Sequence, residues 1–453
     1  MVDSPTDFTP TDSRLKTRLY VMMFLQYFVQ GAYLPVISEY LQSALNFNSA
    51  QIGTFAAALA VGPLITPFIV GQLVDRHFAT QYVLAFCHLS AGVLMLLLYT
   101  QTEYWPVIIL GTLYSTLYTP TMMLTNSLAF QHLKNRDREF PSIRLWGTVG
   151  FIVPAWFVEM YLLKGFTGDE LVNARGIVLV VSGVGGLLMG VYCLTLPHTP
   201  PHRSPSDELA PAKVLGLLRR RGFLVLVLIS FLVAIVHQFY FVWNSPYLRT
   251  ILTSGGGEPG AWEQRIASLG QVFEVVVMAG LGFAVQRFGF KWTMVIGAIA
   301  YVLRCVVFAV AVAVPIPFPA VMTLVCLGQM LHGFCFGCFL ATAFMYVDRV
   351  SPLDVRGTMQ TFYGTFVLSL GFIAGGVISG VIGNAFTRPA AAETLRSQLG
   401  IVTEAGLKAF VQDGAEGKVE MLRDWPGVWL ACAAIAAVAA LLFVALFPSR
   451  EDE

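Results

Sequence analysis

Two short stretches decide the fold: GQLVDR at residues 71–76 and GFAVQR at residues 282–287, each of which follows a long apolar run. Both begin with glycine, carry valine at the fourth place and end with arginine. Glycine permits a tight turn and close approach of helices, while charged side chains cap or pair with helix ends. The repeat indicates two related halves, each with a conformational loop motif, formed by Gly71, Asp75, Arg76, Gly282 and Arg287.

The apolar runs around these loops have the length and composition of membrane spans. Of the 453 residues, 56% are hydrophobic and 12% are charged, with a mean hydropathy of +0.69, whereas soluble domains average about 25% charged residues. A helix needs roughly 20 residues to cross a hydrocarbon core of about 30 Å. We predict an all-α membrane protein with twelve transmembrane helices in two six-helix halves. The spans are expected near 19–42, 50–73, 79–100, 104–131, 144–164, 174–196, 222–250, 265–286, 290–313, 317–347, 357–384 and 425–447.

The stretch between the predicted halves, residues 197–221, is rich in proline and basic residues and is typical of an exposed linker. Basic residues gather in the short loops on the side of this linker and of both termini, and such loops stay in the cytoplasm. A short surface helix is expected at 395–410. The predicted order is a cytoplasmic tail at 1–18, an N-terminal half at 19–196, the cytoplasmic linker at 197–221, a C-terminal half at 222–447 that includes an outer loop at 385–424, and a cytoplasmic tail at 448–453.

Several functional classes are excluded by the charges and cysteines. The net charge is +1 and there is no basic or acidic block, so no nucleic-acid partner is expected. The seven cysteines stand in apolar runs, where packing explains them. Cys335 and Cys338 form a CxxC pattern, but no second pair or histidine set completes a metal site. No nucleophile, metal or cofactor constellation appears, so the sequence does not indicate an enzyme and we expect no cofactor.

Charged residues inside the apolar runs are the best candidates for function, because an ion at the bilayer centre costs about 2.5–3.5 kcal/mol. Arg144, Thr148 and Phe151 stand at i, i+4 and i+7 and therefore share one helix face. They are expected to contribute hydrogen bonds and a ring to a cavity. The alternative is that Arg144 extends to the cytoplasmic interface from its place near the helix start.

Gln271 and Glu274 stand at i and i+3 on the predicted eighth helix, among apolar residues and glycine. Burial away from water favours the protonated form of a carboxyl group unless a cation lies near, so Glu274 is the first candidate for a proton carrier. A buried Glu274 fixed in a structural hydrogen bond is the alternative.

Four further helices carry polar and aromatic residues at helical spacing, and the seventh is expected to break at Ser245–Pro246. Gln26 and His237 are as far apart as the two loop glycines, so the halves place polar groups at equivalent positions. Hydrogen bonding that joins helices explains any one of them equally well. Together they favour a polar, aromatic-lined cavity. The sets are Gln26, Gln30 and Tyr33; Tyr118, Thr121 and Thr125; His237, Tyr240 and Asn244; and His332, Phe336 and Phe339.

Such a lining suits a neutral polar ligand with a flat ring and hydroxyl groups, since rings stack and amides pair with donor and acceptor edges. A strongly cationic ligand needs more carboxylates than Glu274, and a dianionic one more cations than Arg144. For Arg304 a place in the cavity and a structural pairing are equally open.

The repeated loop and the six-plus-six arrangement resemble the major facilitator superfamily. Within it, the sequence resembles the nucleoside:proton symporter family, most specifically at FPSIRLWGTVGFI (140–152). Further similar stretches are YTPTMMLTNSLAF (118–130), LTLPHTP (194–200), SLGQVFE (268–274) and YVLRC (301–305). The resemblance implies a proton-coupled nucleoside importer of the bacterial inner membrane that spans the bilayer many times and works by alternating access as a monomer, with a midplane cavity. It also implies substrate contacts at Arg144, Thr148, Phe151, Gln271, Glu274 and Phe336.

The sequence departs from the family at several of its functional positions. His237 and Tyr240 replace a glutamine and an asparagine on the seventh helix, and His332 replaces a tyrosine on the tenth. An acidic residue that often follows the tenth-helix phenylalanine is Gly337 here. If symport persists, Glu274 becomes the main proton carrier, with His237 or His332 as an assistant.

Two other functions are compatible with the same pattern. A sugar or oligosaccharide symporter shares the twelve-helix plan and an arginine at the start of the fifth helix. A membrane sensor or receptor that binds a ligand without transporting it is the second alternative. The sequence does not decide which nucleosides are preferred or how many protons accompany them.

Overall fold

The computed structural model of the chain describes residues 11–64, 66, 70, 74, 77–201, 221–254, 262–351, 359–360, 362–389 and 421–448. These residues form helices and one small two-stranded ribbon. The N-terminal half consists of α1 Ser13–Tyr33, α2 Ile37–Ser43, α3 Ser49–Leu59, α5 Thr80–Tyr99, α6 Tyr104–His132, α7 Arg136–Phe157, the π-helix η1 Val158–Leu162, α8 Gly168–Ala174 and α9 Ile177–Cys193.

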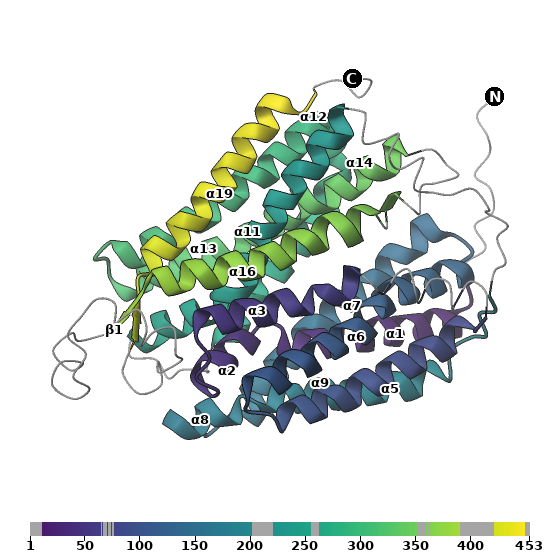
Figure 1. Cartoon of the computed structure of the whole chain (residues 1–453). Helices are drawn as coiled ribbons and strands as arrows, with labels where there is room; N and C mark the ends of the chain where they lie inside the picture. The colour runs from purple at the N-terminus through teal and green to yellow at the C-terminus, as the bar shows by residue number, and fades with distance from the viewer. Residues whose placement is uncertain are drawn as a thin grey trace.

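The C-terminal half follows after the linker, and Figure 1 shows the two halves as neighbouring groups of roughly aligned helices. The start of α1 and the end of α19 lie at the same end of the bundle, opposite to α2 and β1 (Figure 1). The elements are α11 Arg221–Ser254, α12 Glu263–Ala313, α13 Phe318–Phe334, η2 Cys335–Ala341, α14 Thr342–Val350, η3 Phe362–Leu368, α16 Ser369–Ala385, β1 Thr387–Pro389, β2 Met421–Arg423 and α19 Trp425–Leu446.

The prediction of an all-α membrane protein with twelve spans is confirmed. Ten helices among the described residues are long and apolar enough to cross a membrane, and a shorter apolar helix at 49–64 stands at the second predicted span. One of the ten, α12, has 51 residues and is broken at Gly289, where φ is 74°. Positive φ favours glycine, so this residue separates the eighth and ninth predicted spans.

Several predicted boundaries differ from the structure. Helix α1 begins at Ser13, inside the predicted tail, and α1 and α2 are separated at residues 34–36, inside the first predicted span. The predicted break at Ser245–Pro246 is wrong, because Pro246 lies within α11. Buried neighbours keep the helix intact: Trp243 Nε1 donates to the Ser379 carbonyl at 3.0 Å, and Tyr247 Oη donates to the Phe308 carbonyl at 2.7 Å. Packing of this kind offsets the cost of a proline inside a membrane helix.

The loop motif is only partly described. Gly71, Asp75 and Arg76 lie outside the described residues, as does the predicted surface helix at 395–410. Gly282 and Arg287 belong to the first part of α12, and a Cβ placed on Gly282 meets nothing within 4 Å. Among the described residues no neighbour therefore approaches Gly282 closely, and the turn is at Gly289.

The two halves meet closely where α3 packs against α16 (Figure 1). A Cβ on Gly376 would lie 2.6 Å from the backbone nitrogen of Ala57, and one on Gly380 would lie 2.7 Å from the Ser49 carbonyl oxygen. Real Cβ atoms do not approach so closely, so glycine is required for this backbone contact. The ends of the loop predicted at 385–424 also pair, with Thr387 opposite Arg423 in the β1–β2 ribbon.

Candidate functional site

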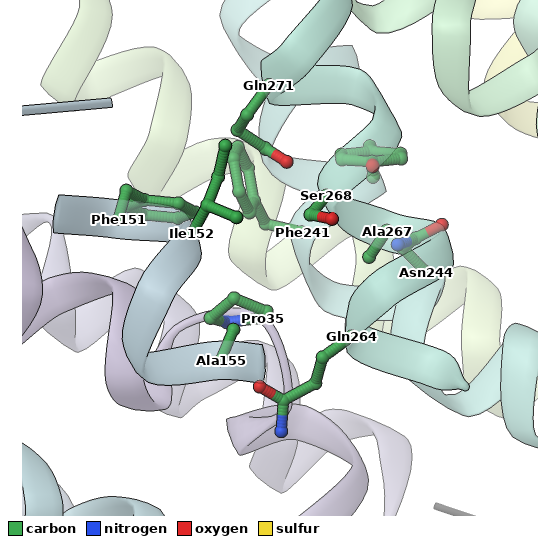
Figure 2. A pocket seen from close by; sticks show the side chains of 11 residues that line it. Pro35, Phe151, Ile152, Ala155, Phe241, Asn244, Gln264, Ala267, Ser268 and Gln271 are labelled. Atoms are coloured by element: carbon green, nitrogen blue, oxygen red, sulfur yellow. The ribbon is translucent and has the colours of Figure 1, made fainter. Parts of the chain in front are cut away.

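A cavity lies between the halves, next to the break between α1 and α2. About 400 Å³ of space, including what is open to solvent, lies among its lining residues, and only a small part of it is wide enough for a water molecule. Figure 2 shows side chains from α7 on one side and from α11 and α12 on the other. The lining residues are Pro35, Phe151, Ile152, Ala155, Tyr240, Phe241, Asn244, Gln264, Ala267, Ser268 and Gln271.

Three of the predicted substrate residues, Phe151, Tyr240 and Gln271, line this cavity together. Phe151 comes from the N-terminal half and the other two from the C-terminal half, so a ligand there contacts both halves. A hydrogen bond also joins the two halves beside the cavity, because Trp156 Nε1 donates to Ser268 Oγ at 2.9 Å. The site combines aromatic rings with amide and hydroxyl groups, which is the lining expected from the sequence.

Arg144, Thr148 and Glu274 stand beside this cavity on the helices that line it. Arg144 and Thr148 are half-buried on α7, two turns and one turn before Phe151 respectively, and the Arg144 guanidinium lies 4.3 Å from the centre of the Tyr27 ring. Glu274 is half-buried on α12, one turn after Gln271. Arg144 and Glu274 belong to different halves, and the charge of Arg144 is near enough to act on the Glu274 carboxyl group.

His237, His332 and Phe336 form an aromatic cluster behind the cavity. The imidazole of His237 stacks on that of His332, with ring centres 5.5 Å apart, and the Phe336 ring is 6.4 Å from His237. His237 Nδ1 is 2.8 Å from Tyr301 Oη. These side chains lie in the second layer of the site and hold the lining residue Tyr240, whose ring stacks on His332 at 4.9 Å.

Arg304 belongs to this cluster, so the structure places it in a pairing with the cluster residues and not in the cavity lining. It is 0% exposed, its Nη1 lies 2.9 Å from His332 Nδ1, and its guanidinium lies 4.2 Å from the Tyr240 ring centre. Arginine only donates, so His332 Nδ1 accepts and the imidazole carries its proton on Nε2. While this contact lasts, His332 is neutral and takes up no second proton, which leaves Glu274 as the better candidate for proton transfer.

Gln26 and Tyr33 lie away from the described cavity. Gln26 Nε2 donates to Thr121 Oγ1 at 2.8 Å, and its Oε1 accepts from His88 Nε2 at 2.9 Å. Tyr33 is buried with its ring edge-on to Tyr114 at 5.5 Å. These contacts match the alternative interpretation, in which polar residues join helices within the N-terminal half.

Ion pairs that the sequence pattern does not indicate join the halves at the end of the bundle with α2 and α8. Glu39 of α2 contacts both Arg175, which follows α8, and Arg249 of α11. Arg175 Nη2 also lies 3.0 Å from Glu263 Oε1 of α12. We call this set of four residues the outer ion-pair network, after the side of the membrane on which the sequence predicts this end of the bundle. It closes this end of the bundle, because each acid contacts an arginine of the other half.

A second cross-half contact lies beside this network. The Glu159 carboxylate of η1 accepts from the backbone N–H groups of Gln264 and Arg265 at the start of α12 and lies 3.4 Å from Arg265 Nε. Spacing along the chain gives no signal for either contact, since their members come from outer segments far apart in sequence.

Two helical halves around a polar, aromatic cavity, closed at one end by ion pairs, define a transporter of the major facilitator fold. The chain belongs to the Nucleoside H+ symporter family, whose family model matches residues 13–452.

Relatives of known name agree over nearly the whole chain. It is 28% identical over 440 residues to the putative nucleoside transporter YegT of Escherichia coli K12, covering 96% of this chain and 94% of the relative. It is 25% identical over 444 residues to the nucleoside permease NupG of the same organism, covering 96% of each chain. A crystal structure of a NupG mutant shares the fold, with a TM-score of 0.80, 23% identity and coverage of 96% and 100%.

Proposed function

We propose that this protein imports nucleosides together with protons by alternating access, through the cavity between its halves. The observation that carries the proposal is the pairing of Phe151 with Tyr240 and Gln271 in one cavity within a chain of the symporter family. A base can stack on an aromatic ring, and an amide can pair with a base edge or a ribose hydroxyl. The protein is an inner-membrane monomer in this proposal, with both termini in the cytoplasm, and needs no cofactor and no catalytic step.

Glu274 couples the proton to movement in this proposal. Its carboxylate and Arg144 attract each other across the halves, and a proton on Glu274 removes that attraction. Gln271 is one turn away, so the proton and the substrate act on the same helix, α12. Release of the substrate and then of the proton inside restores the attraction and favours the return step.

The test is uptake of labelled uridine and adenosine into proteoliposomes with and without an inward pH gradient, alongside maltose as a sugar control. We expect nucleoside accumulation that needs the gradient, and no sugar uptake. Glu274→Gln should abolish accumulation but retain exchange of nucleoside across the membrane, because a neutral side chain mimics the protonated state. The matched control is Glu103→Gln, which removes an exposed carboxylate before α6.

Each part of the proposal has its own contrary result. Sugar uptake without nucleoside uptake would replace the substrate class, and nucleoside binding without any flux would indicate a receptor. Accumulation that survives both Glu274→Gln and collapse of the pH gradient would remove proton coupling at this residue.

A further inference from the structure

Asn244 lines the cavity one helical turn after Tyr240, and both are connected to a buried glutamine behind them. Gln329 of α13 is 0% exposed. Tyr240 Oη donates to Gln329 Oε1 at 2.6 Å, and Gln329 Nε2 donates to Asn244 Oδ1 at 2.7 Å. The three side chains form a hydrogen-bond relay that ends at the cavity wall.

The direction of this relay is fixed at its buried end. Tyr240 is 2% exposed, and within the described part of the chain Gln329 is the hydrogen-bond partner of its hydroxyl group. A buried hydroxyl proton needs an acceptor, so Gln329 must turn its oxygen to Tyr240 and its nitrogen to Asn244. A reversed Gln329 would leave the buried hydroxyl proton without an acceptor, which is unfavourable.

Arg304 and His332 hold the tyrosine itself in place. The buried Arg304 guanidinium lies 4.2 Å from the centre of the Tyr240 ring, and the His332 ring stacks on Tyr240 with ring centres 4.9 Å apart. Two partners on the ring restrict its rotation, so the hydroxyl stays aimed at Gln329.

As a result, Asn244 presents the donor end of its amide to the ligand. Its oxygen is occupied by Gln329, and Figure 2 shows its nitrogen turned to the cavity and its oxygen turned away. Gln271, on the other side of the cavity, has no hydrogen-bond partner among the described residues, so its amide can turn to suit either a donor or an acceptor. Of these two lining amides, Asn244 is the one whose polarity is fixed by a hydrogen bond.

We propose that Asn244 determines base specificity: it selects nucleosides with a carbonyl oxygen at purine C6 or pyrimidine C4, such as inosine and uridine, over adenosine and cytidine, which carry an amino group there. This inference rests on the proposed function. A carbonyl accepts from the Asn244 amide nitrogen, whereas an amino group brings two donors together and leaves both unpaired. The oxo and amino bases of each pair differ little in size, so the comparison isolates hydrogen bonding.

The experiment measures KM for inosine against adenosine, and for uridine against cytidine, in proteoliposomes of the full-length protein. One well-placed hydrogen bond corresponds to roughly tenfold, so we expect KM to be about tenfold lower for the oxo member of each pair. Asn244→Asp keeps the shape but offers an acceptor, and should reverse both ratios. Tyr240→Phe keeps the ring but removes the hydroxyl proton that fixes the relay, and should bring both ratios of KM towards one.

The outcomes separate this inference from the proposed function. If no nucleoside is transported by the wild type, the proposed function fails. If nucleosides are transported but the oxo and amino members of each pair have equal KM, or Asn244→Asp leaves the ratios unchanged, the inference about Asn244 fails alone. Should the aspartate variant not fold, as judged by its melting temperature, the Tyr240→Phe ratios decide the question.

Discussion

Removing the charge of Glu39 should open the outer end of the transporter. This carboxylate is 1% exposed and contacts two arginines, Arg175 and Arg249. Breaking a buried ion pair costs about 3–5 kcal/mol. Arg175 keeps a second partner in Glu263 at 3.0 Å, so we take the lower value for Glu39→Gln, about 3 kcal/mol. Because 1.4 kcal/mol is a factor of ten, the balance should move on the order of a hundredfold away from the closed outer end.

The assay follows access to the cavity from outside. Ala267 lines the cavity, so Ala267→Cys reports on it when sealed, right-side-out vesicles are treated with a membrane-impermeant maleimide. Six of the seven native cysteines are buried and the seventh is half-buried, which keeps background labelling low. In the Ala267→Cys background we expect Glu39→Gln to raise the labelling rate strongly, because the state that is open to the outside becomes well populated.

Glu103→Gln is the matched control, since the same substitution at an exposed carboxylate should leave the labelling rate unchanged. Equal labelling rates for Glu39→Gln and the parent protein would refute the reasoning that this network holds the outer end closed. A faster rate in the Glu103 variant as well would indicate a general effect of charge on the reagent.

Three further predictions concern the cavity wall, the contact between halves and the proline of α11. Phe151→Ala should weaken uridine binding by about 1–3 kcal/mol, the usual value of base stacking on a ring, which titration calorimetry measures; an unchanged Kd would exclude stacking there. Gly376→Val should lower the melting temperature and slow transport, because the new side chain collides with the backbone of Ala57; a neutral result would mean that α3 and α16 can separate without cost. Pro246→Ala should leave transport intact and the melting temperature equal or higher, since the helix regains a backbone donor; loss of transport would show that the proline serves the cycle.

The spans were predictable because their signal is compositional, and composition is local. Their ends were less so: Ser13 begins a helix within a polar segment, and Pro246 stays inside one. Both depend on neighbours that a single segment does not reveal. The breaking power of proline, for example, is outweighed by the burial of Trp243 and Tyr247 on either side of it.

The site was predictable in part, since helical spacing identifies residues that share a face but not what the face meets. Phe151 and Gln271 face the cavity, whereas Gln26 faces His88 and Thr121 within its own half. Pairs such as Glu39 and Arg249 could not be predicted from the sequence, because they join segments from different halves. The role of Gln329 in orienting Asn244 also depends on contacts between helices that have no trace in spacing.

The glycine-lined contact between α3 and α16 has a mechanical consequence. At this contact the two backbones touch without interlocking side chains, so one half can tilt against the other with few steric obstacles. We then expect the outer ion-pair network to set the energy barrier between the closed and open states and their relative populations. Substitutions in the segments that carry this network can therefore change the rate and the resting state of the transport cycle without changing the α3–α16 contact.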